Sequence, residues 1–459
     1  MPDSNRRSFL QHAALAAGAA ASPWPQSARA QTPPSDTINL AVVGIHGRGK
    51  SHIEQFGKVP GVRLAYLVDI DERLFPERVA AIEKQHGYRP KTHFDLREVL
   101  KDPDLDAISV ATPDHWHALH TIWACQAGKD VYVEKPCSFT VVEGRRMIEA
   151  ARKYERIVQV GLNRRSIPRT RAAMDFVRSG DFGDPYRMKT AIYKGRASIG
   201  NVQEAAIPEG VDWDLFLGPA PYRAFNINRF HYGWHFFWDT STTDIGNTGV
   251  HSLDVLRWGA KIEQHPTKIH SFGGVYQWDS VQETPNVQNA SYEYEDGRLM
   301  ECELTNLYSP PFDGERGSVD VFYTDEGYVS SAGGWNAMRG QFTPGDAQSA
   351  AGVDETMNNV GFPKRDYLPG PTITAPEDTG EEHFANFIEA VRSRRREDLH
   401  CEIEEGHLST SLAHLANISY RTGRKLTFDP QSETFPGDAE ANRFLTREYR
   451  DPYTLPDEV

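Results

Sequence analysis

Three glycines near the start of the first regular pattern have a spacing suited to phosphate binding. Gly44, Gly47 and Gly49 follow a short, β-branched apolar run at residues 38–43 and precede a helical pattern from about Lys50. Because these positions lack a Cβ, a pyrophosphate can reach the backbone, and the following helix would point its free N–H groups at the same anion. G-x-x-G-x-G also occurs in ordinary loops, so the surrounding residues must show whether this turn binds a phosphate.

An acidic residue stands where a dinucleotide site needs one. Residues 62–71 are typical of a second strand, and Asp69 lies about 20 residues beyond the glycines. A carboxylate there accepts hydrogen bonds from both ribose hydroxyls and repels a 2′-phosphate, which predicts NAD rather than NADP. Arg73 is the nearby residue that could weaken this preference. The alternative is an aspartate that caps the turn after the strand.

Alternating strands and helices must position these residues. Between residues 36 and 160, further strands are expected at residues 106–111, 130–134 and 157–160, separated by helical stretches such as residues 76–85. This alternation predicts a doubly wound parallel sheet, the α/β architecture of a Rossmann domain. Ligands of such sheets bind at the carboxyl ends of the strands, where Thr112-Pro113 and Glu134-Lys135-Pro136 stand.

The residues after Thr112-Pro113 combine a helix start with two histidines. Asp114 can cap a helix that runs from His115 to Gly128. His115 and His117 resemble a metal-binding pair, but the sequence offers no third ligand nearby. We therefore predict no metal.

The pattern changes after residue 160 to that of an antiparallel sheet. A strand is expected at residues 186–193, and alternating runs follow at residues 268–277, 289–306 and 319–331, with hairpin signals at Asp296-Gly297 and Glu326-Gly327. Helices return at residues 381–392 and 404–422. The sequence predicts an α+β domain with a large, open, mostly antiparallel sheet over residues 161–430, and a tail at 431–459 that could be an arm for a partner subunit.

The motifs of the first half together resemble a known enzyme family. Residues 44–49, Asp69, Ala111-Thr112-Pro113 and Glu134-Lys135-Pro136, in this order and spacing, are similar to the glucose–fructose oxidoreductase, inositol dehydrogenase and rhizopine-catabolism (Gfo/Idh/MocA) family. The resemblance covers residues 38 to about 430. It implies a cofactor site made of Gly44, His46, Gly47, Arg48, Gly49, Asp69, Thr112, Pro113, His117, Glu134 and Lys135.

The resemblance also implies catalytic roles. In the family, the lysine of Glu-Lys-Pro lies beside the nicotinamide and the substrate hydroxyl, which makes Lys135 a catalytic residue here. A lysine with an ordinary pKa of about 10.4 becomes a better proton acceptor when burial and nearby positive charge disfavour its ammonium form. For an isolated motif, the alternative is a Glu-Lys pair at the surface end of a strand.

A second cluster, Asn247 and His251, opens a later helix. The two residues are four apart and are expected to share a helical face. Family members carry D-x-x-x-H here, with the histidine as acid/base, whereas this chain has Asn247 in place of the aspartate. Asn247 cannot raise the basicity of the histidine, although Asp244 or Asp239 could supply the charge. The alternative for His251 is a histidine held by the core.

Aromatic residues beside polar ones suggest a carbohydrate site between residues 213 and 239. Rings can stack on the C–H faces of a sugar while polar groups bind its hydroxyls. Trp213 or any other single tryptophan could equally be core. The substrate residues we expect are Asn163, Arg164, Tyr193, Trp234, Trp238, Asp239, Asn247 and His251.

The first 30 residues predict export. Arg6-Arg7 precedes an apolar run at residues 13–21 and Ala28-Arg29-Ala30, the pattern of a cleaved twin-arginine signal. We expect a periplasmic or otherwise exported protein without membrane insertion; an uncleaved anchor is the alternative. The formal charge of −14 argues against nucleic-acid binding, and the four scattered cysteines are expected to be buried thiols.

These observations predict an exported NAD-dependent oxidoreductase that acts on a sugar, polyol or glycoside with tightly bound cofactor. The alternative is a redox-neutral, NAD-dependent glycoside hydrolase, epimerase or lyase that forms a transient keto-sugar. A third possibility is a protein that binds NAD and a sugar without catalysis. A large open sheet also predicts a homodimer or homotetramer.

Overall fold

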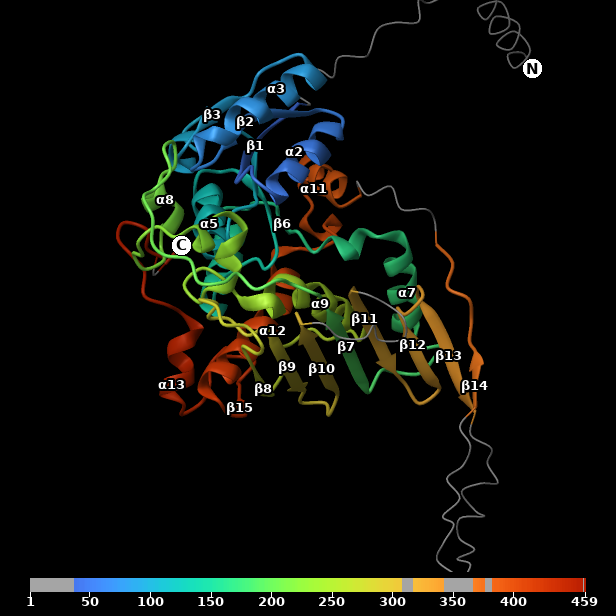
Figure 1. Ribbon diagram of the computed structural model, residues 1–459. Helices are drawn as coiled ribbons and strands as arrows, with labels where there is room; N and C mark the ends of the chain where they lie inside the picture. The colour runs from blue at the N-terminus through green and yellow to red at the C-terminus, as the bar shows by residue number, and fades with distance from the viewer. Residues whose placement is uncertain (1–36, 308–316, 342–365, 376–381, 457) are drawn as a thin grey trace, which may run out of the picture. The chain divides into compact units, whose positions relative to one another are not determined.

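The computed structural model describes residues 37–307, 317–341, 366–375, 382–456 and 458–459 (Figure 1). The expected export signal lies outside the described residues. Two β-sheets organise the rest of the chain, a six-stranded sheet built by the first half and a nine-stranded sheet built by the second. No helix among the described residues is long and apolar enough to cross a membrane.

The first sheet is fully parallel and has the order β3-β2-β1-β4-β5-β6. The chain order reverses between β1 and β4, and ligands bind at such a switch point in doubly wound sheets. This confirms the predicted Rossmann sheet. Its strands are β1 (Ile38–Val43), β2 (Val62–Val68), β3 (Lys91–His93), β4 (Ala107–Val110), β5 (Asp130–Val133) and β6 (Val158–Val160).

Helices cover both faces of this sheet, and one of them comes from much later in the chain. Helix α11 (Glu382–Ser393) places Phe384 and Phe387 against Phe56 and Tyr132, with Phe384 stacked on the Tyr132 ring at 5.1 Å. The helices between the strands are α2 (Arg48–Lys58), η2 (Glu72–Leu74), α3 (Phe75–His86), α4 (Leu96–Val99), η3 (Asp114–Trp116), α5 (His117–Gln126) and α6 (Val141–Lys153).

The second sheet has the order β14-β13-β12-β11-β7-β10-β9-β8-β15, and only the β10–β7 pair among these described strands is parallel. The predicted antiparallel sheet and both predicted hairpins are confirmed. Its strands are β7 (Arg187–Tyr193), β8 (Lys268–Gly274), β9 (Val287–Glu293), β10 (Leu299–Thr305), β11 (Gly317–Tyr323), β12 (Gly327–Ser330), β13 (Asn336–Gln341), β14 (Asp366–Pro369) and β15 (Leu426–Thr427).

One face of the second sheet is buried under helices. Every second residue of β9 and β10 is buried, and these residues pack with α7 (Pro168–Ser179), α9 (Val250–Gly259) and α12 (Ile403–Thr422) (Figure 1). The opposite face carries ion pairs such as Arg187–Glu301 and Lys189–Glu303. The short helices η4 (Asn163–Ser166) and η8 (Arg396–Asp398) lie in connections. All four cysteines are buried and free, as predicted.

A long insertion between β7 and α9 returns from the second sheet to the first. We call residues 194–240 the strap; it contains α8 (Trp213–Leu217), η5 (Ile227–Arg229) and η6 (His231–Phe236). The strap joins the residues that follow β2, because Glu72 N donates to Gly210 O at 2.9 Å and Asp212 N donates to Ile70 O at 2.9 Å. It therefore lies beside the carboxyl end of the parallel sheet.

The tail after Asp429 packs on its own chain. It contains α13 (Ala439–Asn442) and η9 (Arg443–Leu445), and farther on Arg447 Nη2 donates to His115 O at 2.7 Å while Arg450 Nη1 bonds Asp214 at 2.5 Å. The ring of Tyr453 packs 5.2 Å from Trp116. The tail thus secures the strap to the first domain.

Candidate functional site

A cavity of about 370 Å³ opens at the carboxyl ends of β1, β2, β4 and β5, beside the strap. It brings together nearly the whole predicted cofactor set and two of the predicted substrate residues. Gly49 is the one expected cofactor residue outside the lining. The expected residues that line it are Gly44, His46, Gly47, Arg48, Asp69, Thr112, Pro113, His117, Glu134, Lys135, Trp234 and Asn247.

The glycine turn has the shape that a pyrophosphate requires. Gly44 has φ +78°, and a Cβ on Gly49 would lie 1.7 Å from Gly44 O, so both glycines are needed for the turn itself. A Cβ on Gly47 would meet nothing within 4 Å and would occupy open space beside the N-terminus of α2, which no side chain caps. These residues fit a dinucleotide, with its pyrophosphate against Gly47 and the free N–H groups of α2.

Asp69 is held rigidly at the end of β2. Its Oδ2 accepts from Ile45 N at 2.7 Å and its Oδ1 accepts from Asp71 N at 3.0 Å. Burial raises the pKa of Asp69 to about 6, and these backbone donors oppose the rise only in part. Arg73 is bound to Asp71 by contacts of 2.6 and 2.7 Å, so its charge is already paired. The site at the end of β2 therefore suits the free ribose hydroxyls of NAD better than the 2′-phosphate of NADP.

Glu134 forms the buried ionic centre of the cofactor end. Its Oε1 accepts from Arg48 Nε at 2.6 Å and lies 3.0 Å from His52 Nε2. Burial alone would raise the pKa of Glu134, but Arg48 and His52 outweigh it and hold the pKa well below its ordinary value. The Glu134 carboxylate thus joins α2 to the end of β5 and fixes the backbone position from which Lys135 extends.

Asp114, His115 and His117, which follow Pro113, all make hydrogen bonds that hold the chain in place. His117 Nδ1 lies 2.7 Å from Pro136 O and its Nε2 lies 2.9 Å from Thr112 O, while His115 Nε2 lies 3.0 Å from Phe216 O. Both histidines therefore bind backbone carbonyls. The predicted cap by Asp114 is wrong: its Oδ2 accepts from Thr242 N and Oγ1, and the helix begins with η3 instead.

Lys135 reaches across to the second domain. Its Nζ donates to the backbone oxygen of Asn247 at 2.9 Å and to Asn247 Oδ1 at 3.0 Å. Burial lowers the pKa of Lys135, and the carboxylates of Glu134 and Asp114 restore it only in part. Because Asn247 offers two neutral acceptors, it fixes the amine without adding a charge that would favour the ammonium form.

The segment around Asn247 is a π-helical turn, η7 (Ile245–Gly249), that continues into α9. Asn247 lies in this π turn, and His251 follows it in the first turn of α9. Asn247 lines the cavity and its Nδ2 donates to Asp244 Oδ1 at 3.3 Å. Asp244, the nearer of the two proposed acids, is therefore the carboxylate beside Asn247.

His251 does not line the cavity. Burial lowers its pKa well below the ordinary value, and the charges of Lys135 and Arg164 add to the effect. Its Nδ1 is buried without a hydrogen-bond partner among the described residues. His251 thus lies outside the lining of this cavity but close enough to Lys135 to feel its charge.

The other expected substrate residues also lie outside the cavity lining. Arg164 bonds Ser318 and Ser252, and Asn163 begins η4. The Tyr193 hydroxyl donates to Glu303, Asp239 pairs with Arg223, and Trp238 stacks on Tyr420. Trp213 packs in the hydrophobic core of the strap. This agrees with the alternative that a single tryptophan is a core residue.

Several lining residues were missed. They are His231, Tyr232 and His235 from η6, Phe216 from α8, Trp116 from η3 and His120 from α5. His231 stacks on His46 at 4.0 Å and its Nε2 lies 3.3 Å from Asp71. The aromatic run that contains Trp234 was the available signal, but only the tryptophans within it were singled out.

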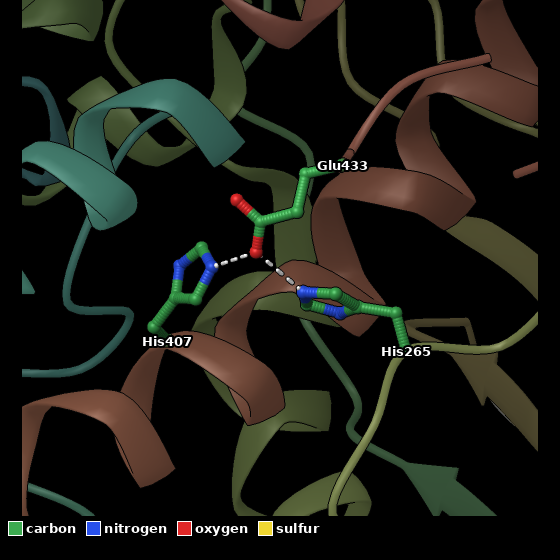
Figure 2. Close-up of side chains that lie close together, drawn as sticks. All are labelled: His265, His407 and Glu433. Atoms are coloured by element: carbon green, nitrogen blue, oxygen red, sulfur yellow. Dashed lines mark hydrogen bonds and ion pairs between the residues drawn. The ribbon is translucent and has the colours of Figure 1, made fainter. Parts of the chain in front are cut away.

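A cluster outside the cavity has the donor types of a metal site. His265 Nε2 and His407 Nε2 each lie 2.8 Å from Glu433 Oε1, with all three ligand atoms within 4.8 Å of one another (Figure 2). However, Arg145 Nη2 donates to the same Oε1 at 2.7 Å and Arg145 Nε donates to Oε2 at 3.1 Å. A guanidinium on the same oxygen repels a cation, so this cluster is a buried polar contact that fixes the tail to α12 and α6.

Comparisons with known proteins match both halves of the chain. The family model described as "Oxidoreductase family, NAD-binding Rossmann fold" matches residues 38–162. A second model, "Oxidoreductase family, C-terminal alpha/beta domain", matches residues 184–323 and 372–455. A solved structure, the WlbA dehydrogenase from Bordetella pertussis with NADH and UDP-GlcNAcA, has a TM-score of 0.61 at 18% identity over 86% of this chain and 98% of that one, which shows a shared fold.

Two curated relatives match the chain over a shorter stretch. YrbE of Bacillus subtilis (strain 168), an uncharacterized oxidoreductase, is 31% identical over 152 residues, which is 33% of this chain and 43% of that protein. An alpha-N-acetylgalactosaminidase from Shewanella oneidensis is 29% identical over 156 residues, which is 33% of this chain and 34% of that protein. The chain thus spans less than half the length of these relatives. With both family models matched, the chain belongs to the glucose–fructose oxidoreductase, inositol dehydrogenase and rhizopine-catabolism family of NAD-binding oxidoreductases.

Proposed function

We propose that this protein is an exported NAD-dependent oxidoreductase that acts on a sugar, polyol or glycoside and keeps its cofactor tightly bound. The observation that carries the proposal is one cavity that joins the glycine turn and Asp69 to Lys135 and Asn247. Bound NAD would supply a hydride acceptor at this edge of the sheet. The first domain alone would support only dinucleotide binding, whereas the Lys135–Asn247 contact adds a group that can take a proton.

Lys135 is the proton acceptor for the reacting hydroxyl. As a neutral amine it has two hydrogens and one lone pair, and both hydrogens are used by the two oxygens of Asn247 at 2.9 and 3.0 Å. The lone pair is then left for a substrate hydroxyl. A positioned group of this kind contributes about 10²–10⁴ to rate. His251, outside the cavity lining, is kept neutral by burial and by the charge of Lys135.

The strap supports tight cofactor binding. It pairs with residues 70–72 just beyond Asp69, and His231 from the strap contacts both His46 and Asp71 at the ribose end. Arg450 of the tail in turn bonds Asp214 of the strap. Strap residues that line the cavity beside the cofactor end would slow the release of a dinucleotide, and slow release suits a protein that is exported with its cofactor already bound. The paired charge of Arg73 favours NAD over NADP.

A sugar is the substrate class best supported by the cavity. Trp234, Tyr232 and His235 offer ring faces and polar atoms side by side at the Lys135 end. Two proteins similar to this chain carry sugar names, the Shewanella alpha-N-acetylgalactosaminidase and the WlbA dehydrogenase solved with UDP-GlcNAcA. We also propose that the open face of the second sheet forms a homo-oligomer contact.

A second candidate is redox-neutral chemistry, in which a transient keto-sugar undergoes elimination, epimerisation or glycosidic cleavage. The observation that favours it is Asn247, which replaces the acidic residue of simple dehydrogenases in the family, together with the glycosidase name of one relative. In an exported protein, such a cycle needs no external nicotinamide.

Screening the purified full chain against a carbohydrate panel tests the proposal. Bound nicotinamide absorbance should rise in a single turnover with at least one sugar. In the redox-neutral case, product should form with only a transient rise. Saturable sugar binding without any cofactor reduction would overturn the proposal in favour of a binding protein.

A further inference from the structure

The strap brings a second proton acceptor into the cavity. His235, from η6, lines the same cavity as Lys135 and Asn247, although it comes from a different element. One alcohol oxidation releases a single hydroxyl proton, for which Lys135 is already placed. A second acceptor in the same cavity therefore indicates a second proton transfer.

The tautomer of His235 is fixed by the backbone. Its Nδ1 lies 2.8 Å from Tyr232 O, and a carbonyl can only accept, so Nδ1 carries the hydrogen. Nε2 then holds a lone pair, and this atom has no hydrogen-bond partner among the described residues. The ring is kept in place between Trp234, at 3.6 Å between centroids, and Tyr232, at 4.3 Å.

Burial keeps this imidazole neutral. Burial lowers the pKa of His235 to about 3; the Asp244 carboxylate opposes the change, while Lys135 and Arg196 add to it. Asp244 is itself paired with Arg196 at 2.6 Å. The neutral ring has a free lone pair at Nε2, but its low pKa makes it a weaker base than an ordinary histidine, so it can take a proton only from a carbon that a neighbouring carbonyl acidifies.

We infer that His235 is a catalytic residue whose Nε2 accepts a proton from the carbon next to a carbonyl of the bound sugar. In this step the C–H bond breaks, its electron pair delocalises onto the carbonyl oxygen as an enolate, and the proton forms a new N–H bond at Nε2. The proton can return to either face, or a group on the next carbon can leave. No oxidant is consumed in this step. The inference rests on the proposed function, which supplies the keto-sugar.

The test supplies the ketone directly, so that it does not depend on cofactor turnover. The full chain in D₂O is given a panel of methyl keto-glucopyranosides with the ketone at carbon 2, 3 or 4, and deuterium uptake beside the carbonyl is followed by NMR. The wild type should catalyse exchange with at least one member. His235→Asn, whose amide can keep the bond to Tyr232 O, should lose about 10²–10⁴ of that rate while its NAD affinity is unchanged.

Two further measurements separate catalysis from folding. Added imidazole should restore part of the exchange in His235→Gly, an effect that a purely structural role would not give. The matched control is His270→Gln, because His270 is an exposed residue of β8. This variant should catalyse deuterium exchange at the wild-type rate.

The inference is overturned if the wild type exchanges no member of the panel, or if His235→Asn exchanges at the wild-type rate. It is also overturned if ¹⁵N NMR of labelled histidine places the hydrogen of His235 on Nε2. Failure of the proposed function looks different, because no carbohydrate would then reduce the bound nicotinamide.

Discussion

The two ends of the cavity are built in different ways. At the cofactor end, Gly47 and Asp69 follow consecutive strands of one parallel sheet, and local chain order alone places them together. At the substrate end, Lys135 meets Asn247, which is 112 residues away, and His235 arrives on a long insertion. The difference suggests that cofactor binding is fixed by the fold, whereas the reaction is set by the strap and the π-helical turn.

The largest effect should come from the one residue that joins the two ends. Lys135→Met removes the lone pair that takes the hydroxyl proton, so single-turnover cofactor reduction should fall by about 10²–10⁴. NAD affinity, measured by calorimetry, should change little. His251→Asn should cost much less, because His251 does not line the cavity. Lys84→Met, on exposed α3, is the control. Equal losses for Lys135→Met and His251→Asn would contradict the assignment.

The next effect isolates the cofactor end. Gly47→Ala has room in the protein, since no atom lies within 4 Å of the new Cβ, so the melting temperature should not change. The methyl group would instead meet the pyrophosphate, and NAD affinity should fall by about 10–100-fold, as overpacking costs about 1–3 kcal/mol. Gly195→Ala, which also has open space, is the matched control. Unchanged NAD affinity in Gly47→Ala would place the phosphates elsewhere.

A smaller effect concerns the acid that holds the ribose. Ribose hydroxyls donate to the ionised carboxylate of Asp69, whose pKa is raised to about 6 by burial. The carboxylate is ionised above that pH and protonated below it, so NAD affinity should fall by about tenfold per pH unit as the pH drops below 6. Binding to Asp69→Asn should be weaker and flat between pH 5 and pH 7. If the NAD affinity of the wild type did not change between pH 5 and pH 7, Asp69 would not be the acceptor of the ribose hydroxyls.

Local chain order explains how much could be predicted. The glycine turn, Asp69 and Thr112-Pro113 are fixed by strand ends within one sheet, so their types and spacing sufficed to predict the cofactor end. The strap could not be placed, because it pairs with residues 70–72 through backbone atoms, which carry no sequence signal. Helix α11 likewise crosses to the first domain through Phe384 and Phe387, whose apolar pattern does not say which sheet they cover.

The π-helical turn is the second feature that sequence spacing could not reveal. The spacing of four residues pairs Asn247 with His251, whereas in the structure the Asn247 side chain bonds Lys135 and Asp244. Glu433, which closes the tail against His265 and His407, was likewise hidden in a segment without a regular pattern.

The smallest effect tests why an asparagine stands in this turn. Asn247→Asp would place a carboxylate against Lys135 Nζ, favour the ammonium and raise the pKa of Lys135 by about 1–3 units. Deprotonation of Lys135 would then need a higher pH. The rising limb of the pH–rate profile should therefore shift to higher pH by the same amount. Asn289→Asp, on the open face of the second sheet, should leave the profile in place. A profile that does not move in Asn247→Asp would separate Asn247 from the chemistry of Lys135.

The nicotinamide content of the purified full chain, as isolated, tests the central claim most directly. We expect about one nicotinamide per chain, retained through gel filtration and reduced in place by a sugar substrate. Retention for hours corresponds to a dissociation rate of about 10⁻⁴ s⁻¹ and, with an association rate of about 10⁵ M⁻¹s⁻¹, to a Kd of about 1 nM. Protein without nicotinamide, or protein that needs one added NAD for each product formed, would contradict a cofactor held under the strap.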